Sequence, residues 1–447
     1  MSVGRRGGQR QQSMWIACDK VAQSPGHPFY RKLNEVLREE GFDRFAEDLC
    51  APFFRDGGRP SIPPGVYFRM IMIGYFEGLS SERAVAWRCA DSFSLREFLG
   101  LGLEESTPDH SSLSVWRKRL GIEVFEKVFQ RVLGMIQARG LLSSKALGID
   151  ATTLEANAAM RSIVRKDTGA SYRGYLEKLA REEGIENPSP EQLRRFDRKR
   201  KGKKTSNRDW ESPSDPDSRV ARMKDGTTHL AYKAEHAVDL ESSVVVSATV
   251  QPADRGDPQS LPETLEEAKT NLKAAGGDGG VVWVVADRGY HKAELIKDLA
   301  ETQGVWTCIP ERDAHGTRRR WDGDDAARRA FHANRRRYRS SFGKSLMRSR
   351  GNIVERTFAH LLETGALRRV FVRGLENVRK RYLLHVLAYN LGVLMRMLFG
   401  MGTPRSPRDR RSLLFAALAL MLMWLWVASE GVPEGATHNH DDAVLRS

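Results

Sequence analysis

The amino-acid sequence predicts an α/β fold, in which an all-helical N-terminal region precedes a mixed five-stranded sheet with covering helices. From residue 27 to about 135, apolar residues recur at helical spacing. From residue 143 onward, short apolar runs rich in β-branched residues alternate with further helical stretches, which is typical of an α/β sheet. A length of 447 residues favours two or three structural units, and an apolar share of 40% is enough for real cores.

The first elements of the chain are predicted helices. A pair of prolines precedes the apolar stretch 65–79, which we expect to form a central core helix. Further along, Thr107 is the predicted N-cap of a helix that carries Arg117 and Lys118 toward its outer side. Several short helices ending in a basic one fit a helix-turn-helix DNA reader, and they fit a helical bundle with a charged surface equally well.

The second region is predicted to contain five strands. Three strands come first, and a helix, a strand, a helix, a strand and final helices follow. The predicted strands are 145–150, 229–240, 242–251, 281–286 and 305–310, and the helices between them are 262–275 and 292–303. This is the order that we expect of a ribonuclease H-like domain, although periodicity alone does not fix the topology.

An insertion, 160–228, separates the first two predicted strands. Its stretch 171–184 has helical spacing, whereas the following polar segment, rich in turn-forming residues, predicts a mobile and solvated loop. A basic run at 194–204 lies in that segment. The run is consistent with contacts to DNA phosphates and also with a merely solvated surface.

The charge of the chain favours a polyanionic partner. Lys and Arg outnumber Asp and Glu by 72 to 57, which gives a net charge of +15 and argues against a small neutral substrate. A second basic run, 310–350, holds 13 Lys or Arg against 5 acids and is interleaved with aromatic residues. Because Arg binds phosphate through paired hydrogen bonds and aromatic rings stack on exposed bases, we expect this run to contact DNA.

Three acids are the candidate catalytic residues. Asp150 and Asp287 each follow a predicted strand, and Glu355 lies on a predicted helix just after the basic run. Taken singly, each Asp is ordinarily a turn or cap residue and Glu355 a surface residue, so only the combination is informative. Carboxylates are ligands that Mg²⁺ prefers, and two divalent ions can activate an oxygen nucleophile and stabilise the leaving oxygen of a phosphodiester. We therefore expect these acids to bind two metal ions that act on nucleic acid.

Six longer motifs surround or precede these acids. They are IDATTLEANAA around Asp150, VVADRGYH around Asp287, NIVERTFAHLLETGALRRVFVRGLENV around Glu355, and, nearer the N-terminus, RPSIPPGVYFRMIMIGYFEGLSSERAV, SFSLREFLGL and TPDHSSLSVWRKRL. Together they resemble the motifs of the DDE transposases of bacterial insertion sequences that carry an InsH-type N-terminal domain. The resemblance runs from about residue 27 to residue 398.

This resemblance implies a ribonuclease H-like catalytic domain with two Mg²⁺ ions, for which Mn²⁺ can substitute. It implies strand cleavage at the ends of a mobile element and strand transfer into target DNA. The partners would be DNA with terminal inverted repeats and, in a synaptic complex, further copies of the chain as a homodimer or larger assembly. The scattered cysteines form no metal-binding motif, and we expect a cytoplasmic, nucleoid-associated protein.

The chain departs from related families in one respect. Those families place a Tyr, an Arg and a Lys at fixed offsets around the Glu, whereas here Arg350 precedes Glu355 by five residues and the Lys position is Leu362. Arg368 or Arg369 is the candidate replacement for the missing Lys. The predicted DNA-binding residues are Arg117, Lys118, Arg350, Arg356, Arg368 and Arg369.

These observations divide the chain into four parts. They are a flexible N-terminus at 1–26, a helical DNA-binding domain at 27–135, the catalytic domain at 140–400, and a basic and hydrophobic tail at 401–447. The tail contains the apolar stretch 413–428, which is short for a membrane span. We interpret it as a buried helix or an oligomer contact, with a membrane anchor or an altered chain end as the alternatives. The alternative functions are a catalytically silent, transposase-derived repressor and a membrane-tethered nuclease.

Overall fold

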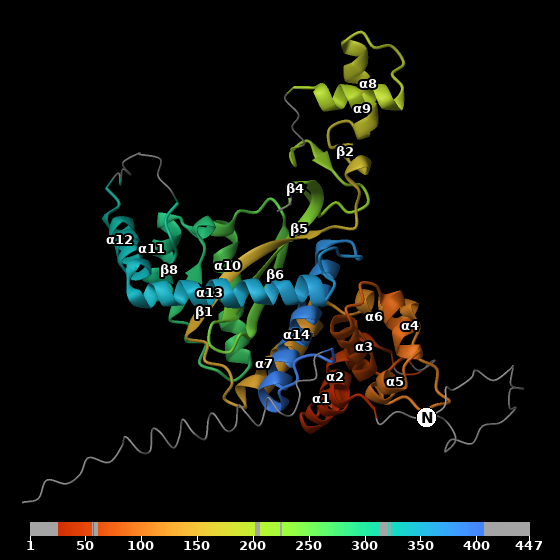
Figure 1. Ribbon diagram of the computed structural model, residues 1–447, viewed down its shortest axis with the longest axis vertical. Coiled ribbons are helices and arrows are strands. Elements are labelled where there is room, and N and C mark those ends of the chain that lie inside the picture. The colour runs from red at the N-terminus through yellow and green to blue at the C-terminus, as the bar shows by residue number, and fades with distance from the viewer. Residues whose placement is uncertain are drawn as a thin grey trace, which may run out of the picture.

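The computed structural model describes residues 26–405, except 56, 58–60, 202–205, 224–225, 313–320 and 322. Nearly all of the predicted flexible N-terminus and the whole apolar stretch 413–428 lie outside the described residues. Within the described part, an all-helical region is followed by a mixed sheet with covering helices, so the predicted fold class is confirmed (Figure 1).

The five predicted strands form the centre of one sheet. They are β1 (Ala146–Glu155), β5 (Thr228–Asp239), β6 (Val245–Pro252), β7 (Trp283–Ala286) and β8 (Trp306–Cys308). Their spatial order is β6-β5-β1-β7-β8, in which β1 pairs antiparallel with β5 and parallel with β7. A sixth short strand, β4 (Arg219–Arg222), pairs with the first residues of β5, beyond the end of β6.

Strand β1 is longer than the sequence predicts. The predicted strand ends at Asp150, but β1 continues to Glu155, so Asp150 lies in mid-strand. The extension ATTLE contains two β-branched threonines, and its residues pair with β5 along their whole length. Asp150 is therefore fixed by hydrogen-bonded neighbours on both sides along the chain.

Two helices cover opposite faces of the sheet. Helix α13 (Ser341–Ala359) crosses β8, β7 and β1 on one face, and α10 (Asp257–Ala274) packs on β5 and β6 on the other (Figure 1). Glycine at position 148 permits the close approach of α13, because a β-carbon there would lie only 2.8 Å from Val354 Cγ2 and 2.7 Å from Leu240 Cδ2. Helices α11 (Ala293–Glu301) and α12 (Asp325–Arg339) lie beyond β8.

The N-terminal region is helical as predicted. Its helices are α1 (Pro28–Glu39), α2 (Phe42–Cys50), α3 (Pro64–Glu77), α4 (Glu82–Ala90), α5 (Phe93–Leu99), α6 (His110–Arg119) and α7 (Ile122–Gln137). The prediction of a central core helix is confirmed, because α3 is buried on nearly every side. The predicted N-cap of α6 is wrong. Asp109 caps this helix, since its carboxylate accepts a hydrogen bond from the amide of Ser111 at 2.8 Å.

Helix α14 (Leu375–Phe399) joins the helical region to the sheet. It packs against α3 and α7 on one side and against β6 on the other. The Asn390 side chain donates to the carbonyl of Val245 at 2.7 Å and accepts from its amide at 2.9 Å, which fixes α14 on the sheet edge. Among the described helices, α14 alone is long and apolar enough to cross a membrane, and 78% of its most apolar window is buried inside the protein.

The insertion between β1 and β5 is more ordered than predicted. It contains α8 (Tyr172–Glu182), as predicted, but also α9 (Pro190–Lys199), which occupies part of the segment predicted to be a mobile loop. Ser189 caps α9 in a capping box with Gln192, and a proline follows at the first helical position, so local signals start this helix despite its polar composition. The short strands β2 (Val164–Arg165) and β3 (Trp210–Glu211) pair at its base.

Candidate active site at the end of the central strands

Asp150 and Asp287 lie side by side at the centre of the sheet. Strands β1 and β7 run parallel, with Ile149 paired with Ala286, and each aspartate is the next residue along its chain. Since neighbouring strands are about 4.8 Å apart and paired positions share a face, the two carboxylates start from adjacent positions on the side that α13 covers. The prediction that strand geometry brings these two acids together is therefore supported by the register.

Arg350 of α13 pairs with Asp150. Its Nη2 lies 2.7 Å from Asp150 Oδ2, and the guanidinium is largely buried, with 9% of its side chain exposed. The Arg350 Nε has no hydrogen-bond partner within the described part of the chain. A buried guanidinium with unused donor capacity therefore stands beside the first candidate catalytic acid.

His236 supports α13 from the sheet. It lies opposite Asp150 in the β1–β5 register, and its ring stacks on that of Phe358 at 3.8 Å. The Thr357 hydroxyl donates to the carbonyl of Val354, which leaves it to accept from His236 Nε2 at 3.0 Å. Burial, with a smaller effect of the nearby Arg350, lowers the pKa of His236 to about 3, so the ring is neutral at ordinary pH.

The neutral ring needs one donor and one acceptor partner. With Nε2–H donating to Thr357, His236 Nδ1 accepts from the Tyr382 hydroxyl at 3.1 Å. Burial and, to a lesser degree, Glu235 raise the pKa of Tyr382, so its hydroxyl keeps the proton that this bond requires. These two hydrogen bonds join α13, the sheet and α14 at the residue that lies opposite Asp150.

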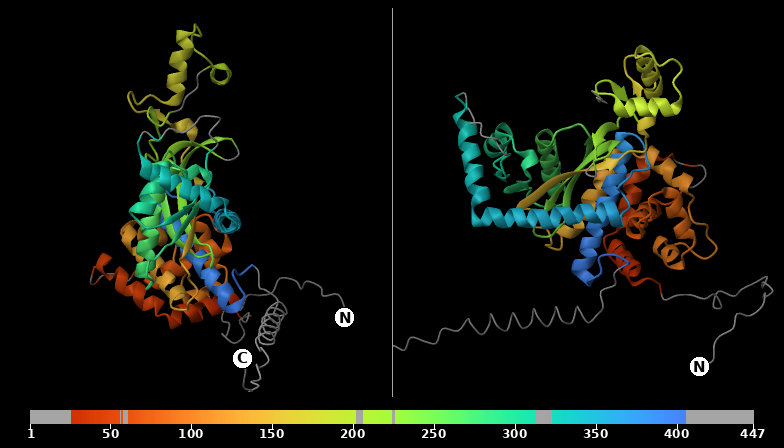
Figure 2. Two further views of the ribbon diagram at one scale, coloured as in Figure 1. Left: turned by 90° about the vertical axis from the view of Figure 1, so that its left-hand side faces the viewer. Right: turned by 45° about the horizontal axis from the view of Figure 1, so that its top comes forward.

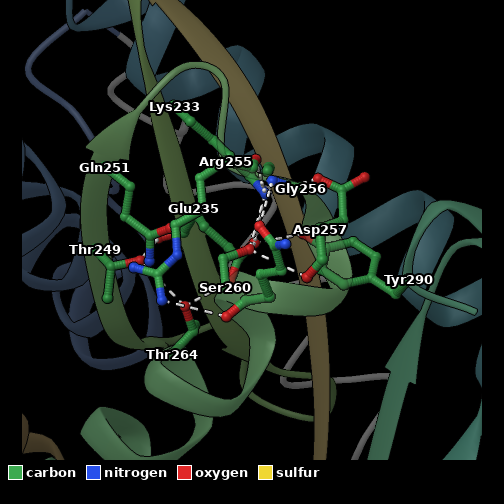
Figure 3. Close-up of polar contacts among 12 residues, drawn as sticks. Lys233, Glu235, Thr249, Gln251, Arg255, Gly256, Asp257, Ser260, Thr264 and Tyr290 are labelled. Carbon is green, nitrogen blue, oxygen red and sulfur yellow. Dashed lines mark hydrogen bonds and ion pairs between the residues drawn. The ribbon is translucent and has the colours of Figure 1, made fainter. Parts of the chain in front are cut away.

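A second polar network lies on the opposite face of the sheet (Figure 3). Its centre is Glu235, a fully buried carboxylate of β5. It accepts hydrogen bonds from the hydroxyls of Ser260 at 2.6 Å, Thr264 at 2.5 Å and Tyr290 at 2.8 Å. Burial, followed by the charge of Glu235, raises the pKa of Tyr290 well above its usual range, so the phenol remains a donor.

Tyr290 connects this network to the second candidate acid. It belongs to the 3₁₀ turn Arg288–Tyr290, whose N-cap is Asp287, and Asp287 Oδ1 accepts from the Gly289 amide at 2.7 Å. The Tyr290 hydroxyl anchors the far end of that turn to Glu235. The position of Asp287 is thus held by its own turn and by a buried bond across the sheet.

Lys233 balances part of the negative charge of this network. Its ammonium lies 2.7 Å from Asp257 Oδ1, 2.8 Å from the Ser260 hydroxyl and 3.4 Å from Glu235 Oε2. Asp257 Oδ2 also lies near the Asp287 turn, 2.7 Å from where a β-carbon on Gly289 would stand. This glycine therefore lets the turn approach the start of α10.

Sequence reasoning missed the β5 residues Lys233, Glu235 and His236. The signal was present, because charged and polar residues interrupt a strand that is otherwise apolar. Buried charges persist only when they are paired or hydrogen-bonded, so such an interruption indicates a specific polar network.

The third predicted acid, Glu355, belongs to α13, five residues after Arg350. It lies on an exposed side of α13, and no hydrogen bond or ion pair holds it within the described residues. The neighbouring inward positions of the helix are Val354 and Thr357, which are buried against the sheet. The register thus brings two of the three predicted acids to adjacent positions, and Glu355 stays a prediction as the third ligand.

The residues present fit a magnesium site in part. Mg²⁺ is typically bound by one or two carboxylates together with waters and substrate phosphates, and Asp150 and Asp287 supply such a pair. Within the residues that the structure describes, no group of three or more His, Cys, Asp or Glu side chains is close enough to hold a metal ion. The fit therefore rests on the two aspartates, and Asp150 is already paired with Arg350.

The predicted DNA-binding residues fall into two groups. Arg117 and Arg350 face inward, since Arg117 pairs with Glu82 at the α4–α6 contact and Arg350 pairs with Asp150. This placement does not support a direct surface contact by Arg117. The exposed members are Lys118, Arg356, Arg368 and Arg369. Arg368 pairs with Glu363, and Arg369 lies 3.6 Å from Glu155.

Comparison with known families gives two matches along this chain. Residues 18–119 match the model described as Transposase domain (DUF772). Residues 168–391, half of the chain, match the model described as Transposase DDE domain, a range that includes Asp287 and Glu355 and begins after Asp150. No curated protein and no solved structure matches the chain.

Proposed function

Because the chain belongs to the DDE transposase family, we propose that it cleaves DNA at the ends of a mobile element and joins the freed 3′ ends to target DNA. The observation that carries this proposal is the parallel register of β1 and β7, which sets Asp150 beside Asp287. In the first step water replaces the 3′ oxygen at phosphorus, leaving a 3′ hydroxyl and a 5′ phosphate. In the second, that hydroxyl attacks a target phosphodiester and displaces the target 3′ oxygen.

We assign Asp150 and Asp287 as ligands of the catalytic Mg²⁺ ions. Glu355 is proposed as the third carboxylate on the strength of its motif alone. Two such ions, when bound, activate the attacking oxygen and stabilise the leaving one. Mn²⁺ is expected to substitute, since it accepts the same oxygen ligands.

The protein's own contribution is to orient these acids. Arg350 holds Asp150 at 2.7 Å, and the Asp287 turn is anchored through Tyr290 and Glu235. The Arg350 guanidinium is largely buried, so its proposed role is to position Asp150, and a phosphate contact by Arg350 stays a prediction. Lys118, Arg356, Arg368 and Arg369 are exposed and are proposed as further phosphate contacts.

We propose that the working assembly contains at least two copies of the chain, because two element ends have to be brought together. DNA with terminal inverted repeats and a target duplex are the corresponding partners. The membrane-tethered alternative rests on residues 413–428, which lie outside the described residues, whereas α14 is packed between the helical region and the sheet.

The proposal is tested with the purified full chain and the DNA that flanks its reading frame. With Mg²⁺, we expect nicking at the inverted repeats and joining to a target plasmid. Asp150→Asn and Asp287→Asn should each reduce both products at least a hundredfold while the DNA affinity stays the same. The matched control is Asp278→Asn, a surface acid paired with Lys145 at 3.3 Å, which should cleave normally.

Two outcomes would contradict the proposal. Cleavage that survives in Asp287→Asn would exclude the carboxylate mechanism. Specific binding of the inverted repeats by the unmodified chain, without cleavage in Mg²⁺ or Mn²⁺, would instead favour the catalytically silent repressor.

A further inference from the structure

The insertion forms an arm that stands apart from the rest of the molecule. We use "the arm" for residues 160–201 and 206–211, which contain α8, α9 and the β2–β3 pair. It projects beyond the sheet in every view (Figures 1 and 2). Leu176, Ala180 and Leu193 form a small core of their own, separate from the main hydrophobic core.

The arm has a defined shape rather than that of a flexible loop. Trp210 of β3 makes edge contacts with Tyr172 and Tyr175 of α8, each at 5.3 Å between ring centres. The Tyr172 hydroxyl donates to Asp197 of α9 at 3.0 Å, which joins the two helices. The arm therefore presents the outer face of α9 in a fixed orientation.

That outer face is strongly basic. Leu193 and Phe196 face the small core, whereas Arg194, Arg195, Arg198 and Lys199 are exposed. The acids of α9 neutralise little of this charge, because Glu191 pairs with Arg195 and Asp197 pairs with Arg200. Arg194, Arg198 and Lys199 have no ion-pair partner among the described residues.

This charge is not needed for folding. Like charges at i and i+4, such as Arg194 with Arg198, destabilise a helix. Basic residues in the last turn interact favourably with the helix dipole, which offsets part of that cost for Arg198 and Lys199 but not for Arg194 in the first half of the helix. A face that only contacts solvent could equally well carry alternating positive and negative charges. The row formed by Arg194, Arg198 and Lys199 therefore indicates an anionic partner.

The base of the arm is joined to the segment that follows α13. The Glu155 amide donates to the carbonyl of Arg368 at 3.1 Å, and the Val370 amide donates to the carbonyl of Glu155 at 2.9 Å. Beyond this point, Asn157 donates to the carbonyl of Phe371 at 3.0 Å. The arm thus begins where the exposed Arg368 and Arg369 lie, on the side toward which the helix of Glu355 leads.

We propose that the outer face of α9 binds the phosphate backbone of duplex DNA that extends past Arg368 and Arg369, away from the cleavage point. The inference rests on the proposed function for its partner, DNA, but assigns a site that the chemistry of the three acids does not require. The contacts are to phosphates, through Arg194, Arg198 and Lys199, and they secure a longer stretch of duplex without reading its sequence.

The test compares two triple variants of the full chain that remove equal charge. The arm variant is Arg194→Gln with Arg198→Gln and Lys199→Gln. The control changes Arg38, Lys127 and Lys273 to Gln, on α1, α7 and α10; these are exposed and form no ion pair with another described residue. Affinity for a long duplex is measured over a series of salt concentrations, since each phosphate contact contributes about 0.9 to the slope of log affinity against log salt.

For the arm variant alone, we expect the slope of log affinity against log salt to become smaller in magnitude by about 2.7. This variant should also bind the long duplex at least tenfold more weakly in moderate salt. With a short duplex that ends near the cleavage point, the arm variant and the control should bind equally. The variant that replaces Arg194 and Arg198 by Lys should retain the slope, and unchanged far-ultraviolet circular dichroism excludes unfolding of α9.

Equal slopes for the arm variant and the control on the long duplex would overturn the proposal. A change of oligomeric state without a change of slope would also overturn it and would assign the arm to contacts between protein chains. Failure of the proposed function is distinguishable, because it shows as absent cleavage by the unmodified chain, whereas the arm is judged by binding alone.

Discussion

The Arg350 guanidinium lies 2.7 Å from the Asp150 carboxylate, in the position where a cation would otherwise neutralise that acid. The pair joins α13 to the central strand and depends on the close approach that Gly148 permits. Metal binding at Asp150 and the packing of α13 are consequently coupled through one side chain.

Replacing Arg350 by Met should make the protein more responsive to metal. The change leaves Asp150 without its partner, and removing one member of a buried pair costs about 3 kcal/mol. Because a divalent ion no longer competes with the guanidinium, added Mg²⁺ should raise the melting temperature more in this variant than in the unmodified protein. Thermal unfolding with and without Mg²⁺ measures both effects. Arg356→Met, at an exposed position of the same helix, should change neither; an equal Mg²⁺ response in all three proteins would contradict the coupling.

Two glycine-to-alanine changes near this pair should change the free energy of unfolding in opposite directions. In Gly148→Ala the new β-carbon meets Leu240 and Val354 at less than 3 Å, so α13 has to move and we expect a loss of about 1–3 kcal/mol. Gly351→Ala meets no atom within 4 Å and removes a glycine from the interior of α13, so a gain of about 0.5–1 kcal/mol is expected. Urea unfolding checks both; equal effects would show that α13 does not pack on β1 as described.

Tyr290→Phe should weaken the support of Asp287. The ring remains, but the buried Glu235 loses one of its donors, and a hydrogen bond to a charged group contributes about 1.5–3 kcal/mol. The Mg²⁺ concentration for half-maximal cleavage should rise several-fold while DNA affinity is unchanged. Tyr30→Phe is the matched control, because its buried hydroxyl donates to Glu77 at 2.7 Å within the helical region, between α1 and α3. A lowered melting temperature with an unaltered Mg²⁺ requirement would assign Tyr290 to folding alone.

His236 should make stability fall in mild acid. Its pKa is about 3 in the folded protein, whereas an unfolded chain has a His pKa near 6.5. Above pH 6.5 both states are neutral and the contribution is fully present. Below it the unfolded chain binds one more proton, so the free energy of unfolding falls by about 1.4 kcal/mol per pH unit.

The measurement is urea unfolding at pH 7.0 and pH 5.5. The decrease should be larger by about 1.4 kcal/mol in the unmodified protein than in His236→Gln. His229→Gln is the control, because the His229 side chain is 38% exposed beside Glu155. The same pH dependence in all three proteins would mean that His236 is protonated in the folded state.

The fold was largely predictable from the sequence, because apolar runs and helical spacing directly reflect burial. The five central strands and the core helix α3 follow from those patterns. The end of β1 could not be predicted from those patterns, because Thr152 and Thr153 extend the strand by pairing with β5, which lies some 80 residues away in sequence. The helix α9 was missed because its capping signals are local, whereas its composition resembles a solvated loop.

The candidate site was predictable only in part. Asp287 follows a strand end and Asp150 is indicated by its motif, but the pairing of Arg350 with Asp150 depends on where α13 crosses the sheet. For the same reason the sequence did not reveal that Arg117 faces Glu82 while Lys118 is exposed. Side-chain direction on a helix is set by its packing partners, and these were distant in sequence.

The burial of α14 has a consequence for how the chain is made. This helix spans 25 residues, and its most apolar window has a mean hydropathy of 1.4, so by length and composition alone it resembles a membrane span. Its packing partners α3, α7 and β6 all precede it in the sequence and are therefore synthesised first. During translation, α14 is therefore made only after the segments that bury it. A gene in which α14 preceded those segments, or that lacked them, would leave this apolar helix exposed.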